Sequence, residues 1–391
     1  MLLAQINRSR DLKQLVDEGF EIEVKGGHLI VHHVPYVNSS RQVKYGKLIS
    51  TLKLNNDLTM KPDTHVMGFM GEFPCNKDGS QITAIQHSSP NRQIADGIIM
   101  NYTFSNKPKT GYNDYYHKVT QYEKIISASA KSIDRTVTSQ TFKVLECNED
   151  ESVFLYTDSN SSRANINNLN EKFRGQKIGI IGLGGTGSYV LDFVAKTPVD
   201  EILLFDSDEF LQHNAFRSPS AASVEILNKR MKKVEYLSSV YAQMRRGIKA
   251  IPEKVTETNI DLLKGLSFVF VCIDSNKARS VIISKLKEFG ITFIDVGLGV
   301  NVAEENLIGT LRVTVGSPEK YDHIPSRIGT EEIDDNEYAT NIQIADLNAL
   351  NALLAVIKWK KLCGFYQDLK NEHNSTFVVN TGQLLHDDYT A

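Results

Sequence analysis

The sequence KIGIIGLGGTG, residues 177–187, decides the fold of the second half of the chain. Its first five residues form a short, largely apolar run typical of a buried β-strand, and a helical pattern of Tyr189, Leu191 and Val194 follows directly. Glycines at such a turn let the backbone bend tightly and bring N–H groups and the positive helix end against a phosphate. The stretch therefore predicts a nucleotide-binding turn formed by Gly182, Gly184, Gly185 and Gly187.

Around this turn the chain alternates apolar strands with helical segments. We predict strands over residues 177–181, 201–205, 268–272, 293–296 and 311–315, and a long helix over residues 341–362. The apolar runs are too continuous for a sheet that has one face in water. The pattern predicts an α/β fold, a Rossmann-like, mostly parallel sheet with helices on both faces.

The first half of the chain has a different pattern. A short helix near Leu12 and Leu15 precedes alternating apolar residues on either side of Gly26 and Gly27, which indicates a β-hairpin. Short strands and turn signals continue to about Tyr156, so we expect a β-rich α+β accessory domain over residues 1–157. Residues 157–168, rich in Asp, Ser and Asn, are the predicted linker, and the second domain is expected over residues 163–391.

Bulk properties exclude several classes of protein. The formal net charge of −3 gives no overall positive field, so neither nucleic acid nor an anionic membrane is an expected partner. No apolar run approaches the length of a membrane span, and the N-terminus lacks the pattern of a signal peptide, which indicates a cytoplasmic protein. The four cysteines form no Cys-x-x-Cys pair, so we expect neither a disulfide framework nor zinc.

The acid that ends the second strand leaves two enzyme classes open. Asp206 stands where a carboxylate binds a ribose hydroxyl, which suits an NAD-dependent oxidoreductase and an ATP-dependent enzyme equally. The continuation DSDEFLQHNAFR, residues 206–217, adds a second acid, an amide and a guanidinium. A dinucleotide pyrophosphate that already sits on a helix end has no use for them, whereas a triphosphate under attack needs fixed positive charge. This stretch favours ATP.

These motifs resemble the ThiF/MoeB and ubiquitin-activating (E1-like) adenylyltransferases, over roughly residues 163–365. An Asp-x-Asp followed by Asn and Arg is typical of that family, as are a Lys-x-Glu helix, similar to residues 233–235, and a strand-end Asp followed by Arg, similar to Asp274 and Arg279. The resemblance implies ATP and Mg²⁺. It assigns the glycine turn and the pair Asp206 and Asp208 to the nucleotide, with Asp206 on the ribose. It assigns the phosphates to Asn214, Arg217 and Lys233, and the metal to Asp274.

The resemblance also implies a homodimer in which an N-terminal arginine reaches the partner's ATP site, and Arg163 is the candidate. The chain departs from relatives that form a thioester, because residues 293–362 contain no cysteine. Cys75, in a turn of the first domain, is a weak substitute. We therefore expect direct transfer from the adenylate, or an oxyester on a hydroxyl such as that of Thr340, which also suits a helix N-cap.

The sequence thus predicts an enzyme that adenylates the C-terminal carboxylate of a small ubiquitin-like protein. Transfer to a conjugating-type (E2-like) partner, in a pathway of bacterial type with a fused companion domain, completes the hypothesis. Within the class, the alternative substrates are a tRNA or a small molecule. Outside it, the alternatives are an NAD-dependent oxidoreductase and a nucleotide-binding scaffold without activity.

Overall fold

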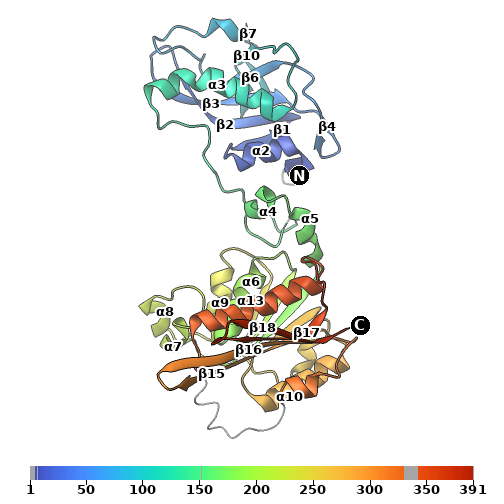
Figure 1. The fold of residues 1–391 in the computed structure, drawn as a ribbon. Helices are drawn as coiled ribbons and strands as arrows, with labels where there is room; N and C mark the ends of the chain where they lie inside the picture. Colours follow the sequence, from blue (N-terminus) through green and yellow to red (C-terminus); the bar gives the residue numbers. More distant parts are fainter. Residues whose placement is uncertain (1–4, 7, 151, 330–341, 391) are drawn as a thin grey trace. The chain divides into compact units, whose positions relative to one another are not determined.

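The computed structural model describes residues 5–6, 8–150, 152–329 and 342–390. It divides into two compact units, Met1–Leu145 with Thr157–Asn165, and Glu146–Tyr156 with Ile166–Ala391 (Figure 1). The predicted linker contains two short helices, α4 (Ser159–Arg163) in the first unit and α5 (Asn167–Asn170) in the second. Residues 146–156, which the sequence pattern places with the first domain, belong to the second unit, where the backbone N–H of Leu155 donates to the carbonyl of Met244 at 2.9 Å.

The first unit is an antiparallel sheet of order β1-β2-β3-β6-β10-β7, with two helices packed on it. This confirms the β-rich α+β class and the predicted helix and hairpin at its start. The sheet strands are β1 (Ile22–Lys25), β2 (His28–Val37), β3 (Val43–Thr51), β6 (Val66–Met70), β7 (Gln86–Ser88) and β10 (Tyr102–Ser105). Smaller elements are α2 (Arg10–Asp17), η1 (Thr83–Ile85), and the ribbons β4 (Leu54–Asn55) with β5 (Leu58–Thr59) and β8 (Arg92–Ala95) with β9 (Ile98–Met100).

A helix that the sequence analysis missed, α3 (Tyr115–Ile133), covers β2 and β3. Its buried stripe of Tyr115, Val119, Tyr122 and Ile126 has helical spacing. Lys118 interrupts the apolar pattern but is also fully buried, and donates to the Ser50 hydroxyl at 2.9 Å. Burial lowers the pKa of Lys118 to about 8. The helix was missed because two tyrosines and a lysine on its buried face interrupt the periodic pattern of aliphatic residues.

The second unit is an eight-stranded sheet of order β13-β12-β11-β14-β15-β16-β17-β18. The first five strands in this order are parallel, and the last three pair antiparallel. The strands are β11 (Lys177–Ile181), β12 (Glu201–Phe205), β13 (Ile248–Ile251), β14 (Phe268–Val271), β15 (Phe293–Ala303), β16 (Asn306–Gly316), β17 (Glu372–Val378) and β18 (Gln383–Tyr389). The mostly parallel class is confirmed. The strand predicted at 311–315 is, however, antiparallel to its neighbours, because a hairpin at Glu304 and Glu305 joins it to β15.

Helices cover both faces of this sheet (Figure 1). On one face α6 (Gly185–Ala195), α9 (Lys233–Tyr241) and α13 (Ala345–Leu362) enclose Ile178, Ile180 and Ile294. On the other, α10 (Asn276–Glu288) packs on Phe205, Val271 and Phe293. The remaining elements are η2 (Glu171–Phe173), α7 (Gln212–Ala215), α8 (Val224–Asn228), η3 (Ile260–Leu263) and α11 (Ile324–Arg327). Within the described ranges, no helix is long and apolar enough to cross a membrane.

A buried ion-pair network ties the end of α13 to β17. Lys358 donates to Asp368 at 2.8 Å and Lys361 donates to Glu372 at 2.9 Å, and the Glu372 side chain is 4% exposed. Burial opposes ionisation of Asp368, but the hydrogen bonds from Lys358 and from the Asn371 backbone outweigh it and lower its pKa to about 2. The charged form of Asp368 is therefore part of the folded state at neutral pH.

This network predicts a pH dependence of stability. A folded-state pKa of about 2 lies below the unfolded value of about 3.9, so ionised Asp368 stabilises above pH 4 and this contribution is lost as the pH falls toward 2. The shift corresponds to about 2 kcal/mol of unfolding free energy. Urea unfolding between pH 2 and pH 5 measures it. In Asp368→Asn the unfolding free energy should change less with pH over this range. A pH dependence equal to that of the wild type contradicts the assignment.

Candidate functional site

The glycine turn lies between β11 and α6, as predicted. Gly182 has a φ of +87°, in the left-handed region, and a Cβ there would lie 2.7 Å from the carbonyl oxygen of Cys272. A Cβ on Gly187 would lie 1.9 Å from the carbonyl oxygen of Gly182, so the turn is closed on itself. A Cβ on Gly184, the N-cap of α6, would meet nothing within 4 Å. The turn therefore presents open space at the helix N-terminus, where a phosphate fits.

Asp206 fixes the turn to the neighbouring strand. Its Oδ2 accepts from the Leu183 backbone N–H at 2.7 Å, and its Oδ1 accepts from the Asp208 backbone N–H at 2.9 Å. Its side chain is 9% exposed. Each carboxylate oxygen can accept two hydrogen bonds and accepts one of them here, so both keep a lone pair for a ribose hydroxyl.

Lys233 is the lysine of the Lys232-Lys233 pair that faces the site. It begins α9, is buried, and its Nζ lies 2.7 Å from Asp208 Oδ2 and 3.7 Å from Asp206 Oδ2. Lys232 Nζ instead donates to the Ser207 carbonyl at 2.8 Å. The hydrogen bond from Lys233 lowers the pKa of the Asp208 carboxyl. Asp208 thus stays ionised at neutral pH and holds the ammonium beside Asp206.

Arg217 and Asn214 come from α7 and the turn after it. Asn214 is buried, and its Oδ1 accepts from the Leu211 backbone N–H at 2.9 Å, so it shapes the start of α7. Arg217 Nε is buried and has no hydrogen-bond partner among the described residues. The pKa of His213 is lowered by burial and then by the positive charges of Arg217 and Lys233. An unpaired buried guanidinium nitrogen requires a partner, and an anion provides one.

Asp274 follows β14 and its side chain is exposed. The N-cap of α10 is Ser275, whose hydroxyl accepts from the Ala278 backbone N–H at 3.4 Å, so Asp274 is not the cap. No group of three or more metal-ligating side chains occurs in the part of the chain that the structure describes. Mg²⁺ in phosphate sites commonly binds one or two carboxylates and the substrate phosphates, and a single carboxylate at this strand end fits that donor set.

Two of the predicted site residues, Arg163 and Thr340, stay predictions. Arg163 ends α4 in the first unit, is exposed, and donates from Nη2 to the carbonyl of Asp17 at 2.6 Å. Thr340 lies outside the described residues. Cys75 is 1% exposed, and it pairs with Val37 and Gln81 in short bridges. Burial raises the pKa of the Cys75 thiol, so the thiolate needed for a thioester is disfavoured.

The sequence analysis also missed an asparagine under the glycine turn. Asn348 of α13 is fully buried, its Oδ1 accepts from the Thr186 hydroxyl at 3.1 Å, and a Cβ on Gly185 would lie 2.0 Å from its Nδ2. Close packing of α13 on α6 therefore requires glycine at position 185. The available signal was a pair of polar residues, Asn348 and Asn351, on the core face of an otherwise apolar helix.

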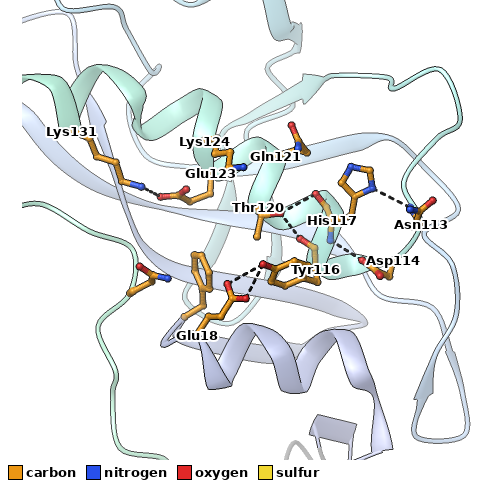
Figure 2. A pocket seen from close by; sticks show the side chains of 12 residues that line it. Glu18, Asn113, Asp114, Tyr116, His117, Thr120, Gln121, Glu123, Lys124 and Lys131 are labelled. Carbon is orange, nitrogen blue, oxygen red and sulfur yellow. Dashed lines mark hydrogen bonds and ion pairs between the residues drawn. The ribbon is translucent and has the colours of Figure 1, made fainter. Parts of the chain in front are cut away.

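The first unit has a pocket of its own, of about 550 Å³, beside α3 (Figure 2). Its polar groups are largely paired with one another. The Tyr116 hydroxyl donates to Glu18 at 2.8 Å, and Glu123 accepts from Lys131 at 2.6 Å and from Ser139 at 2.7 Å. Among the described lining residues, no buried charged atom lacks a hydrogen-bond partner as Arg217 Nε does, so the strand ends of the second unit remain the better candidate site.

Two family models match the chain. Residues 10–159 match a domain of unknown function, DUF6791, and residues 159–323 match the ThiF family. No curated protein gives a significant match. Among solved structures, E. coli MccB with ATP is 16% identical, with a TM-score of 0.47, over 59% of this chain and 72% of that one. PaaA is 14% identical, with a TM-score of 0.46, over 74% of this chain and 93% of its own.

A third structure, E. coli tRNA N6-threonylcarbamoyladenosine dehydratase, TcdA, is 17% identical, with a TM-score of 0.39, over 52% of this chain and 92% of that one. The family assignment rests on the sequence match rather than on these structures. The matched range contains the glycine turn, Asp206, Arg217, Lys233 and Asp274. Residues 159–323 of this chain therefore form a ThiF family domain.

Proposed function

We propose that the second unit uses ATP to adenylate a carboxylate. The observation that carries this proposal is the unpaired, buried Nε of Arg217, whose positive charge acts on His213 together with that of Lys233. A nicotinamide dinucleotide has two phosphates, and the N-terminus of a helix is sufficient to bind them. A triphosphate brings more negative charge, and the lysine and the arginine match it.

The chemistry follows from these groups. An oxygen of the substrate carboxylate forms a bond to the α-phosphorus of ATP. The bond from that phosphorus to the oxygen bridging to the β-phosphorus breaks, and pyrophosphate leaves with the electron pair. Two anions approach each other, so positive charge fixed beforehand lowers the barrier. In this proposal Arg217, Asn214 and Lys233 bind the phosphates, Asp206 and Asp208 orient the ribose and the lysine, and Asp274 binds Mg²⁺.

For the substrate we propose the C-terminal carboxylate of a small ubiquitin-like protein, and for the acceptor a conjugating-type partner. The support is the resemblance of the motifs together with the fused first domain. Residues 293–362 offer no thiol and Cys75 is buried, so direct transfer or an oxyester on Thr340 is preferred to a thioester. A homodimer that uses Arg163 across the interface belongs to the same proposal. A tRNA and a small molecule stay the alternative substrates.

Two measurements test the proposal. Purified protein with Mg²⁺ should bind ATP in calorimetry, and NAD at millimolar concentration should not displace it. With a cognate ubiquitin-like protein, labelled pyrophosphate should exchange into ATP, because adenylation is reversible while pyrophosphate is present. Binding of NAD without binding of ATP would instead indicate an NAD-dependent oxidoreductase. Binding of ATP without pyrophosphate exchange for any carboxylate substrate would indicate a nucleotide-binding scaffold.

A further inference from the structure

A buried charge cluster lies next to the proposed nucleotide site, on the α10 face of the sheet. Asp295 of β15 is fully buried; it accepts from Arg279 Nε at 3.0 Å and from Arg312 Nη2 at 2.6 Å. Two guanidinium groups thus share one carboxylate. The three side chains together carry one positive charge that no carboxylate among the described residues is seen to pair. Buried charge without a partner is unfavourable, so an anion is expected to bind there.

The two arginines differ in what remains available. The Arg279 side chain is 8% exposed and all three of its nitrogens are bonded, to Asp295, to Asn276 Oδ1 and to the Ile273 carbonyl. Arg279 therefore fixes the loop that carries Asp274. The Arg312 side chain is 21% exposed, and its described bonds go to Asp295 and to the Thr314 hydroxyl at 2.5 Å. A guanidinium has five N–H donors, so Arg312 keeps donors for a ligand.

Arg312 is also held in one orientation. The Thr314 hydroxyl that accepts from it donates in turn to Asn374 Oδ1 at 2.8 Å, and both Thr314 and Asn374 are buried. The guanidinium lies against Gly297 of β15, where a Cβ would come within 3.0 Å of Nη2. A side chain at position 297 would crowd this group. Arg312 is thus preorganised, which reduces the entropy lost when a ligand binds.

The sheet register places Arg312 along the edge that carries the nucleotide residues. The neighbouring strands run β12-β11-β14-β15-β16, and Asp295 pairs with Val271 while Gly297 pairs with Arg312. Strands lie about 4.8 Å apart, so a guanidinium over β15 is about one strand spacing from β14, which leads into Asp274. Along this edge the order is Asp206, the glycine turn, Asp274 and then Arg312.

We propose that Arg312 binds the carboxylate that is to be adenylated, an inference that rests on the proposed function. The phosphates have their own cations, Arg217 and Lys233, on the far side of the glycine turn. Arg312 lies beyond Asp274 in the strand order, on the opposite side of the glycine turn from those cations, so it is free to hold a nucleophile opposite the leaving pyrophosphate. Its free N–H groups match a carboxylate in charge and geometry.

The test uses the full-length protein, Mg²⁺, a non-hydrolysable ATP analogue and a dye-labelled synthetic peptide that ends in Gly-Gly. Fluorescence anisotropy compares the peptide acid with the same peptide bearing a C-terminal amide. In the wild type the acid should bind about 10-fold more tightly than the amide. Arg312→Gln should abolish that preference. Asp295 keeps its pair with Arg279 in this variant, so the protein should fold, and its thermal midpoint is measured alongside.

Arg327→Gln is the matched control, because Arg327 is a half-buried arginine paired with Asp388 at 2.7 Å and has no proposed role in the site. It should keep the preference, and Arg312→Lys should keep part of it. The inference is overturned if the wild type binds the acid and the amide equally, or if Arg312→Gln keeps the preference for the acid. It is also overturned if Arg312→Gln lowers the affinity for the ATP analogue as strongly as the affinity for the peptide, because Arg312 is then a phosphate ligand. Failure of the wild type to bind the analogue contradicts the proposed function instead.

Discussion

Replacing Arg217 by alanine is expected to lower the rate of ATP–pyrophosphate exchange by a factor of about 10² to 10³, with little change in thermal stability. A contact that stabilises charge in the transition state is commonly worth about 3 kcal/mol or more. The guanidinium Nε has no partner among the described residues, so its removal breaks no intramolecular hydrogen bond there. Exchange kinetics and a melting curve on the same preparation separate the two effects.

Arg230→Ala is the matched control for this experiment. Arg230 is an arginine shortly before α9, but its side chain is 68% exposed and it pairs with Glu209 at 2.8 Å. Exposed pairs of this kind contribute little, so both activity and stability should stay near the wild type. Equal exchange rates in Arg217→Ala and Arg230→Ala would show that Arg217 does not contact the phosphates.

Alanine should have different effects at two positions of the glycine turn. It should lower stability at Gly187 and ATP affinity at Gly184. At Gly187 the new Cβ overlaps the carbonyl oxygen of Gly182 at 1.9 Å, and backbone cannot move aside without opening the turn. We expect a loss of about 3 kcal/mol or more, and hence a fall of at least about 6 °C in the thermal midpoint. Calorimetric unfolding measures this directly.

At Gly184 the new methyl group meets nothing within 4 Å, so folding should be retained. The methyl group instead occupies the space at the α6 N-terminus that the proposal gives to a phosphate. Gly184→Ala should therefore weaken ATP binding at least about 10-fold while the thermal midpoint stays near the wild type. Unchanged ATP affinity in a folded Gly184→Ala variant would place the nucleotide elsewhere.

Local sequence was sufficient to predict an element where its apolar pattern and the turn residues beside it indicate the same structure. The strands at residues 177–181 and 201–205 lie where their apolar runs predict, and the glycine turn lies between the first strand and α6. The strand at 293–296 is longer than predicted, since β15 continues to Ala303. The extension contains Gly297 and Gly299, and these glycines interrupt the apolar pattern, so the sequence analysis ended the strand before them.

Elements stabilised by distant partners were harder to predict. The strands β13, β17 and β18 were not predicted. The edge strands β13 and β18 bury only part of their side chains, and β17, which lies between β16 and β18, is largely polar, so none of the three has a continuous apolar run. Helix α3 was missed because its core face contains Lys118, whose partner Ser50 lies 68 residues away. The boundary residues 146–156 likewise depend on Arg246, whose Nη1 donates to the Phe154 carbonyl at 3.0 Å.

By itself, the sequence determined the α/β class, the position of the glycine turn after β11, and the residue types on which the proposal of ATP rests. These features depend on neighbours within a few residues of one another, where spacing fixes geometry. Only the tertiary structure decided which lysine faces Asp206, that Cys75 is buried, and that Asp295 joins Arg279 to Arg312. Those facts depend on side chains brought together from separate strands and helices, and the distance along the chain between them carries no information about their contact.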